Sequence, residues 1–209
     1  MERAAKHETR RAQLADAILE LASRDGVERV TLRAVAAEAR VSMGQVQHYF
    51  ATKEDMLLYA VEHAMQGMER RIHERVEGTD RNQFESAARM LRSMLEEMLG
   101  TDPETRQLLR MSIALLSRTG GDERIAKALM RDDDQLKAFT TQTILWAQEL
   151  GCADPNLDPV QDAEILWALA GQLGSEVALG YRDATAAMTT LHYALGRIIG
   201  FTTDSVAPV

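Results

Sequence analysis

The chain of 209 residues has one cysteine, four prolines, few aromatic residues and no long apolar run. The single cysteine, Cys152, cannot form a disulfide within the chain, and no Cys and His spacing resembles a zinc site. The longest uncharged stretches, such as residues 184–196, fall short of the ~18 apolar residues of a membrane span. The N-terminal segment is charged and has no apolar core behind it, which argues against a secretory signal. We therefore expect a soluble, cytoplasmic protein with no membrane partner.

Catalytic patterns are also missing. The sequence contains no Gly-rich phosphate loop and no H-E-x-x-H pair, and no histidine is placed to activate Cys152 as a nucleophile. The D-D-D run at 132–134 could suggest a metal, but a solvated helical face is by far the favoured explanation. We expect no catalytic residues, no metal and no cofactor, so an enzyme is the least favoured class.

The charge of the chain is unevenly distributed. The chain has 24 Lys and Arg against 32 Asp and Glu, a net charge of −8. Residues 1–53 hold nine basic and seven acidic side chains, a balance of +2, which leaves −10 for the remainder. This excess of acid argues against coating of nucleic acid, but permits one less acidic module that faces phosphates. Chance variation along the chain is the alternative, and the position of the motifs must decide.

Helical spacing of apolar residues recurs throughout, and nothing alternates as a strand would. The first stripe runs from Leu14 to Ala22, and Gly26 follows where a C-terminal cap is expected. Further helices are predicted from Thr31, Ser42, Thr52 and Asp102 and over about 81–99, 122–150, 158–181 and 183–199, with a frayed tail. These signals predict an all-α fold of about nine helices.

Two short helices near the N-terminus carry the most specific signal. Thr31 is a good N-cap for the first, and Ser42 with Gln45 forms a capping box for the second. Only residues 39–41 separate them, and such a sharp turn is typical of a helix-turn-helix, whose second helix enters a DNA major groove. Helical periodicity then places three residues inward, Val46, Tyr49 and Phe50, and five outward, Met43, Gly44, Gln45, Gln47 and His48.

The string V-S-M-G-Q-V-Q-H-Y-F, followed by A-T-K-E, resembles the recognition helix of TetR-family transcriptional repressors. The resemblance is strong over about residues 9–60 and implies a helix-turn-helix domain at 1–51, with a helical ligand-binding and dimerisation domain at 52–209. It implies phosphate contacts for Thr31 and Arg33, groove contacts for Ser42, Met43, Gln45 and Gln47, and backbone contacts for His48, Tyr49 and Lys53. Gln45 could instead serve only the capping box, and His48 could be a solvated surface side chain.

Two positions depart from the family pattern. Arg40 stands where the family often has glycine in the turn, and a left-handed conformation at a non-glycine residue costs roughly 1 kcal/mol. The turn could adopt another conformation, or Arg40 could offset that cost with a phosphate contact. Gln47 replaces a frequent aromatic residue, which removes a backbone contact and offers an amide that suits adenine or phosphate.

The second domain shows two further patterns. Small residues at helical spacing over 158–181 allow close approach of another helix, and with the last helix they predict a dimer interface; ordinary packing within one chain is the alternative. The predicted interface residues are Ala170, Gly171, Gly174, Ser175, Ala178, Ala187, Leu191, Leu195 and Ile198.

Methionines and aromatic residues between these regions suit a pocket for a flexible ligand, although plain core is the alternative for each. The candidates are Met65, Met68, Phe84, Met90, Met94, Met98, Met111, Phe139, Trp146 and Trp167, with Gln142, Gln172 and His192 as polar anchors. Together these patterns predict a homodimeric repressor that leaves a palindromic double-stranded operator when an apolar or amphipathic effector binds. The alternative is a helical ligand- or protein-binding protein whose helix-turn-helix is only structural.

Overall fold

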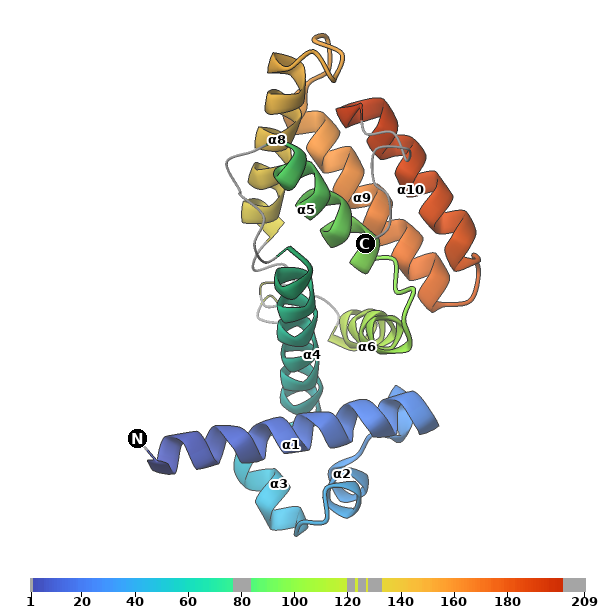
Figure 1. The fold of residues 1–209 in the computed structure, drawn as a ribbon. Helices are drawn as coiled ribbons and strands as arrows, with labels where there is room; N and C mark the ends of the chain where they lie inside the picture. The colour runs from blue at the N-terminus through green and yellow to red at the C-terminus, as the bar shows by residue number, and fades with distance from the viewer. Residues whose placement is uncertain (1, 77–83, 120–122, 124–126, 128–132, 201–209) are drawn as a thin grey trace. The chain divides into compact units, whose positions relative to one another are not determined.

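The computed structural model describes residues 2–76, 84–119, 123, 127 and 133–200. Over these residues the chain forms nine α-helices, one short 3-10 helix and no strand, which confirms the predicted all-α fold. The helices are α1 (Glu2–Asp25), η1 (Val27–Arg29), α2 (Leu32–Glu38), α3 (Met43–Tyr49), α4 (Lys53–Val76), α5 (Phe84–Glu97), α6 (Pro103–Thr119), α8 (Asp133–Glu149), α9 (Pro159–Ala178) and α10 (Ala184–Ile199) (Figure 1).

The helix ends agree closely with the local sequence signals. Thr31, Ser42, Asp158 and Asp183 each cap a helix by accepting hydrogen bonds from backbone N–H groups of its first turn. Gly26 follows α1 with a φ of 85°, as a C-terminal cap requires. The predicted segments 81–83 and 201–209, and most of 122–132, lie outside the described residues.

The chain divides into two compact units that do not follow the sequence order. One contains residues 1–67 and 107–129, and the other contains residues 68–106 and 130–209. Helix α4 therefore contributes to both units, as does α6. The sequence places a functional boundary between residues 51 and 52, whereas packing assigns the first part of α4 to the same unit as the helix-turn-helix.

The first unit buries one face of each short helix. Helix α2 contacts both α1 and α3, and α1 also contacts η1. The buried apolar side chains of this unit include Leu14, Ile18, Leu21, Val30, Val35, Val46, Phe50, Met56 and Leu57. Because α2 and α3 have only seven residues each, this shared core, rather than helix propensity, holds them in place.

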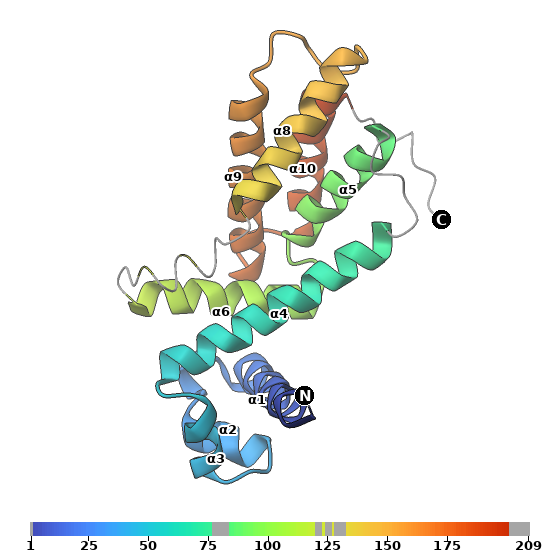
Figure 2. The same cartoon turned by 90° about the vertical axis from the view of Figure 1, so that its left-hand side faces the viewer.

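The second unit is built on α5, α8, α9 and α10, which pack side by side (Figures 1 and 2). Its core includes Leu91, Leu95, Leu99, Ile144, Leu166, Leu173, Leu191 and Leu195. Trp167 is almost fully buried, and its indole N–H donates to the hydroxyl of Thr140 at 2.8 Å. That bond satisfies a buried donor that would otherwise be costly.

Gly200 ends α10 in a left-handed conformation with a φ of 65°. A Cβ at this position would lie 2.0 Å from the backbone oxygen of Cys152. The end of the last helix therefore approaches the α8–α9 connection so closely that only glycine fits there.

Candidate nucleic-acid interface

The turn between α2 and α3 is a Schellman motif with arginine in the usual glycine position. The Val41 N–H donates to the Ala36 carbonyl at 2.9 Å, and the Arg40 N–H donates to the Ala37 carbonyl at 3.2 Å. Arg40 has a φ of 53°. Among the described residues it is the only one other than glycine with a positive φ. The prediction that the turn could adopt another conformation is therefore wrong. The chain keeps the left-handed turn despite its cost, because both hydrogen bonds satisfy carbonyls at the end of α2.

Replacing Arg40 by glycine is expected to raise the free energy of unfolding by about 1 kcal/mol, because glycine removes the left-handed strain. If the guanidinium contacts a DNA phosphate, the same change should also reduce the salt dependence of DNA binding by about one unit of log–log slope. Urea unfolding and binding titrations at several salt concentrations measure both effects. Arg40→Lys keeps the strain and the charge, so a gain of stability in that variant would contradict the argument.

Helix α3 begins with a complete capping box. The Ser42 hydroxyl accepts from the Gln45 N–H at 3.2 Å, and the Gln45 side-chain oxygen accepts from the Ser42 N–H at 3.1 Å. Gln45 therefore does serve the capping box, while its side chain stays exposed with its amide nitrogen as a remaining donor. Gln47 is also exposed. Of the two amides, only Gln47 can offer both donor and acceptor to an adenine without breaking the cap.

The face of α3 opposite Val46 is open to solvent. Met43 is 48% exposed, which is high for a large apolar side chain, and Gly44 and His48 are also exposed. Tyr49 is half-buried, whereas Phe50 is buried. The predicted inward and outward faces of the recognition helix thus hold, with Tyr49 at the border between them.

The flanking residues for which the family resemblance implies contacts with the DNA backbone differ in their hydrogen bonds within the chain. Arg33 is exposed on α2. Thr31 is exposed too, but its hydroxyl accepts from the Ala34 N–H at 3.2 Å as the cap of α2. The Lys53 ammonium lies 3.4 Å from the Glu28 carbonyl, a long hydrogen bond that ties the start of α4 to η1. Thr31 and Lys53 therefore have a structural role besides any contact with phosphate.

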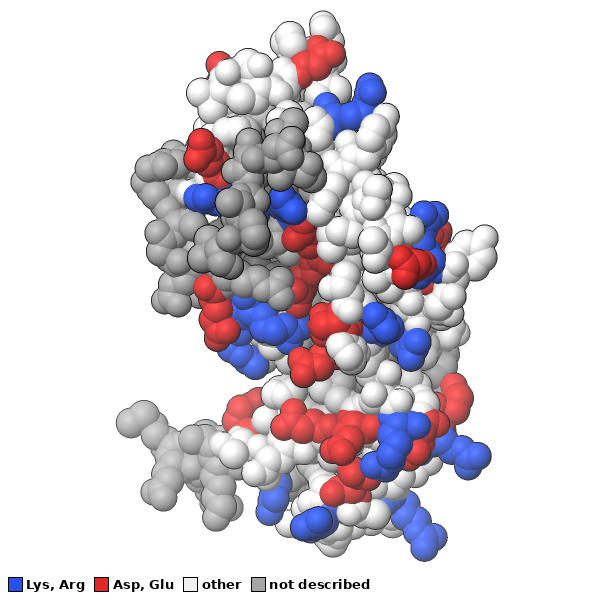
Figure 3. Space-filling view, turned by 45° about the vertical axis from the view of Figure 1, so that its right-hand side comes forward, with Lys and Arg blue, Asp and Glu red and all other residues white. Residues whose placement is uncertain are grey.

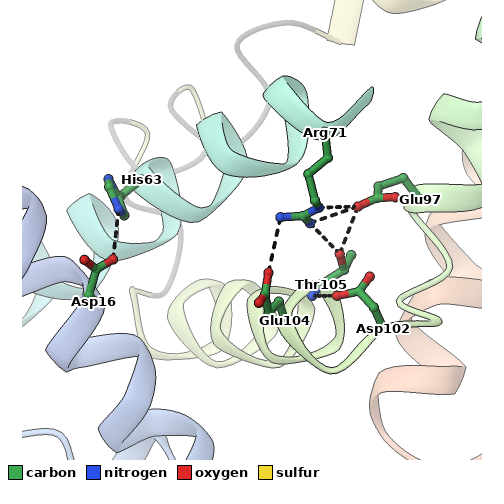
Figure 4. Close-up of polar contacts among 7 residues, drawn as sticks. All are labelled: Asp16, His63, Arg71, Glu97, Asp102, Glu104 and Thr105. Carbon is green, nitrogen blue, oxygen red and sulfur yellow. Dashed lines mark hydrogen bonds and ion pairs between the residues drawn. The ribbon is translucent and has the colours of Figure 1, made fainter. Parts of the chain in front are cut away.

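Helix α4 is fastened to α1 by polar and aromatic contacts. The Tyr59 hydroxyl donates to the Glu8 carboxylate at 2.8 Å, and the Arg11 guanidinium lies 3.9 Å from the centre of the Tyr59 ring. Burial and the Glu8 carboxylate together raise the pKa of Tyr59 to about 12. Further along α4, His63 contacts Asp16 of α1 at 3.1 Å (Figure 4). These contacts hold α1, which supports α2 and α3, against the first part of α4.

A surface ion pair joins the ends of α1 and α2. The Arg24 guanidinium donates to Glu38 at 2.8 Å and also contacts Asp25. The hydrogen bond from Arg24 lowers the pKa of Glu38 below its usual range. Because these groups are exposed, the pair contributes little to stability, but it orients the end of α2 directly before the turn.

Basic side chains lie along the edge of this unit formed by α2 and α3. Figure 3 shows Lys and Arg spaced along that edge, with Asp and Glu gathered on the face above it. Both Arg33 and Arg40 are exposed. This arrangement agrees with the local balance of +2 in the sequence and presents positive charge beside the recognition helix.

The predicted pocket residues are divided between the two units, Met65 and Met111 belonging to the first. Met111 and Trp167 are buried, whereas the other apolar candidates, Met65, Met68, Phe84, Met90, Met94, Met98, Phe139 and Trp146, are half-buried. Phe84, Met98 and Phe139 pack against the core of the second unit. Met111 and Trp167 are thus core residues, which agrees with the alternative that these positions are plain core rather than pocket lining.

The three polar anchors are either engaged within the chain or on the surface. Gln142 is exposed, and Gln172 is exposed with its amide bonded to Glu176 at 3.0 Å. His192 bonds to Glu96, whose carboxylate also binds Arg92 of the same helix. None of these contacts points to a ligand.

Most of the residues predicted to form a dimer interface lie inside a single chain. Gly171 and Ser175 are half-buried, and the buried ones are Ala170, Gly174, Ala178, Ala187, Leu191, Leu195 and Ile198. They are buried because the small side chains of α9 let α10 and α8 approach closely. Packing within the chain, the alternative stated above, therefore describes these seven residues.

Sequence reasoning missed two groups of residues. No sequence pattern marks His7, yet its ring packs on Tyr49 with 4.6 Å between ring centres. The second group joins Arg71 of α4 to Glu97 of α5 and to Thr105 of α6 (Figure 4). No periodicity marks either group, because each joins residues far apart in the sequence.

The site is a helix-turn-helix whose second helix presents polar side chains to solvent beside basic residues, which defines the protein as one of the helix-turn-helix DNA-binding class. Residues 14–60 match the family described as bacterial regulatory proteins of the tetR family. The helix-turn-helix part of the chain is therefore similar to this family of transcriptional regulators.

Several similar proteins are transcriptional regulators. The chain is 25% identical to the transcriptional regulator PksA of Bacillus subtilis over 173 residues. These residues cover 83% of this chain and 80% of that protein. It is 37% identical over 71 residues to the nicotine-responsive repressor HdnoR of Paenarthrobacter nicotinovorans and 37% identical over 68 residues to BetI of Paraburkholderia phymatum. These two matches cover 34% and 32% of this chain, but only 37% and 35% of those proteins.

Solved structures share the fold over most of the chain. A transcriptional regulator from Saccharomonospora viridis, solved with choline, is 21% identical with a TM-score of 0.74, over 88% of this chain and 94% of that one. The multidrug binding protein EbrR, solved with ethidium, is 23% identical with a TM-score of 0.59, over 88% of this chain and 98% of that one. In the part of this chain that the structure describes, no helix is long and apolar enough to cross a membrane.

Proposed function

We propose that the protein is a homodimeric repressor that binds a palindromic operator and leaves it when a small molecule binds. The observation that carries the proposal is the capped recognition helix, whose exposed face holds Met43, Gly44, Gln45, Gln47 and His48. One helix of seven residues reads few base pairs, so two copies about 34–36 Å apart are needed to reach successive major grooves.

The exposed face of α9 and α10 supports the dimer. Ile165 of α9 is 55% exposed and Tyr193 of α10 is 67% exposed, although the two helices pack against each other through their other faces. Two such helices from each of two chains would form a four-helix interface that covers these side chains. The small residues inside each pair would then set the spacing of α9 and α10 rather than contact the partner.

The second unit is the proposed location of the effector site. Met90 and Met94 on α5, with Met98 directly after its end, follow one another at four-residue spacing and are all half-buried, so they lie beside the core rather than inside it. Flexible methionines adapt to ligands of irregular apolar shape, which suits an apolar or amphipathic effector. Relatives were solved with choline and with ethidium, and another is named for nicotine, so small organic molecules are the class to test first.

Intrinsic fluorescence tests the effector site. Both tryptophans of the chain, Trp146 and Trp167, belong to the second unit. A compound that binds there should change the tryptophan emission and weaken the complex with DNA. A change of emission without an effect on DNA binding would contradict a regulatory site.

Helix α4 provides the proposed route between the two functions, since it contains residues of both units. An effector that binds better to one arrangement of this helix shifts the population toward it. Coupling of this kind is typically about 1–3 kcal/mol, enough for a 5- to 150-fold loss of operator affinity.

The decisive experiment is capture and sequencing of genomic DNA bound by the purified protein, followed by a gel shift with the enriched fragments. We expect a short palindromic sequence to be enriched, together with a specific complex at moderate salt. Absence of any specific complex would overturn the proposal. The genes next to the captured sites would also indicate the chemistry of the effector.

Gln45→Glu is expected to leave stability nearly unchanged and to weaken DNA binding at least tenfold. Glutamate at the third helical position still accepts from the Ser42 N–H, so the capping box persists. However, the amide donor is lost and a negative charge faces the phosphates. Gln47→Ala, by comparison, should relax the preference for one base pair by about 1–3 kcal/mol. Thermal unfolding and binding to single-base operator variants measure the two effects; equal loss on all variants from Gln47→Ala would contradict base recognition.

A further inference from the structure

Three aromatic rings from two helices meet at the end of the recognition helix. The ring centre of His7 on α1 lies 4.6 Å from that of Tyr49 and 6.3 Å from that of His48, both on α3. The rings of His48 and Tyr49 are 5.4 Å apart at nearly right angles. His7 and His48 are exposed, and Tyr49 is half-buried. The N-terminal part of α1 thus brings a second imidazole next to a residue of the predicted DNA surface.

Three charged side chains that follow His7 on α1 (Glu8, Arg10 and Arg11) have partners elsewhere. On α1, Glu8 accepts from the Tyr59 hydroxyl of α4, Arg10 donates to Gln13, and Arg11 lies over the Tyr59 ring. Helix α3 contains no Asp, Glu, Lys or Arg, so it supplies no carboxylate to either imidazole. Among the side chains that the structure describes, the rings of Tyr49 and His48 are the aromatic neighbours of His7.

Two neighbouring imidazoles recognise anions in a way that depends on pH. A protonated imidazole offers two N–H donors and a positive charge, and histidine is the side chain that changes charge between about pH 5 and 8. A phosphate placed against both rings would attract both positive charges and so favour the protonated form of each imidazole.

We propose that His7 and His48 form a subsite for one backbone phosphate of DNA, and that binding there takes up protons. This inference rests on the proposed function, because the phosphate is that of the operator. It assigns α1 a direct part in DNA binding besides its support of α2 and α3. By linkage, the affinity for DNA rises as the pH falls, since the bound state holds more protons than the free state.

The test is fluorescence anisotropy of the full-length protein with a labelled random-sequence duplex of about 30 base pairs, long enough for two half-sites. At low salt, the wild type should bind about tenfold more tightly near pH 6 than near pH 8. His7→Gln should reduce that ratio to about threefold, and His7→Gln with His48→Gln should remove most of it, because glutamine keeps polarity but does not titrate. His63→Gln, on α4 beside Asp16, should retain the full ratio.

Each outcome decides a different question. An unchanged pH ratio in the double variant overturns the subsite while leaving DNA binding intact. A uniform loss of affinity with the same pH ratio also overturns it, since the two rings would then act as neutral contacts. Failure of the wild type to bind the duplex, even near pH 6, overturns the proposed function together with this inference. Thermal unfolding of each variant separates loss of contact from loss of fold.

Discussion

Arg71→Met is expected to lower the free energy of unfolding by about 3 kcal/mol, among the largest effects of any single surface-accessible side chain of the protein. The Arg71 guanidinium donates to one oxygen of Glu97 at 3.1 and 2.9 Å and to the Thr105 hydroxyl at 3.0 Å (Figure 4). The Glu97 side chain is only 3% exposed, whereas that of Arg71 is 32% exposed. Removing the cation takes the Arg71 charge away from a buried carboxylate, and the partial exposure of Arg71 places the effect near the lower end of the range for such pairs.

The same network fixes the corner between α5 and α6. Asp102 accepts from the Thr105 N–H at 2.8 Å, and Arg71 also contacts Glu104. Burial alone would raise the pKa of Asp102, but the hydrogen bonds from Thr105 outweigh it and lower that pKa below its usual range. Arg71 therefore binds the last turns of α4 to the connection between α5 and α6, whose residues Asp102 and Thr105 are hydrogen-bonded to each other.

Urea unfolding of a matched set tests this account. Arg70→Met removes a neighbouring exposed arginine and should change stability by less than about 0.5 kcal/mol. Arg71→Met combined with Glu97→Met should recover most of the loss, because two apolar side chains can replace a buried ion pair. If the double variant were less stable than Arg71→Met alone, the buried charge would not be the cause.

The sequence predicts the helices well because the signals at their ends are local. The capping box of Ser42 and Gln45 involves residues three apart, and Asp158 with Pro159 defines the start of α9 without reference to the rest of the chain. The inward position of Val46 likewise follows from helical periodicity alone. Such signals define the helix-turn-helix before any tertiary contact is known.

The sequence could not predict which partner each apolar or charged face would meet. The stripe of Ala170, Gly174 and Ala178 predicts a close helix neighbour, but a helix of the same chain satisfies it as well as a second subunit would. The pairs Arg71 with Glu97 and His7 with Tyr49 join residues 26 and 42 positions apart, so neither follows from spacing on one helix. The conformation of Arg40 was also open, since propensity alone favours another turn there.

Gly44→Ala is expected to stabilise the protein and yet to weaken DNA binding about 10- to 100-fold, the largest functional loss we expect from one methyl group. Gly44 lies inside α3, where glycine is unfavourable relative to alanine by up to about 1 kcal/mol. Apart from the adjoining residues and backbone of α3 itself, no heavy atom of the described residues lies within 4 Å of the position a Cβ would occupy, and Gly44 is not among the glycines with positive φ. Neither backbone conformation nor packing within the chain therefore requires glycine at this position.

A partner that approaches the backbone of α3 closely would explain the absent side chain. Gly44 lies on the exposed face of the recognition helix, between Met43 and Gln45, where a major groove would meet it. Alanine should raise the free energy of unfolding by about 0.5–1 kcal/mol, because it restricts the unfolded chain and favours the helix. The same methyl group would hold α3 away from the base edges and lengthen every neighbouring contact.

Thermal unfolding and operator binding of the same preparation decide between these explanations. Ser23→Ala, at an exposed position of α1, is the matched control: it should stabilise a helix without any effect on DNA binding. A Gly44→Ala variant that is more stable and binds the captured operator as tightly as the wild type would contradict a close approach of DNA to α3. A gain of stability combined with a loss of binding would show that DNA, and not the fold, requires glycine at this position.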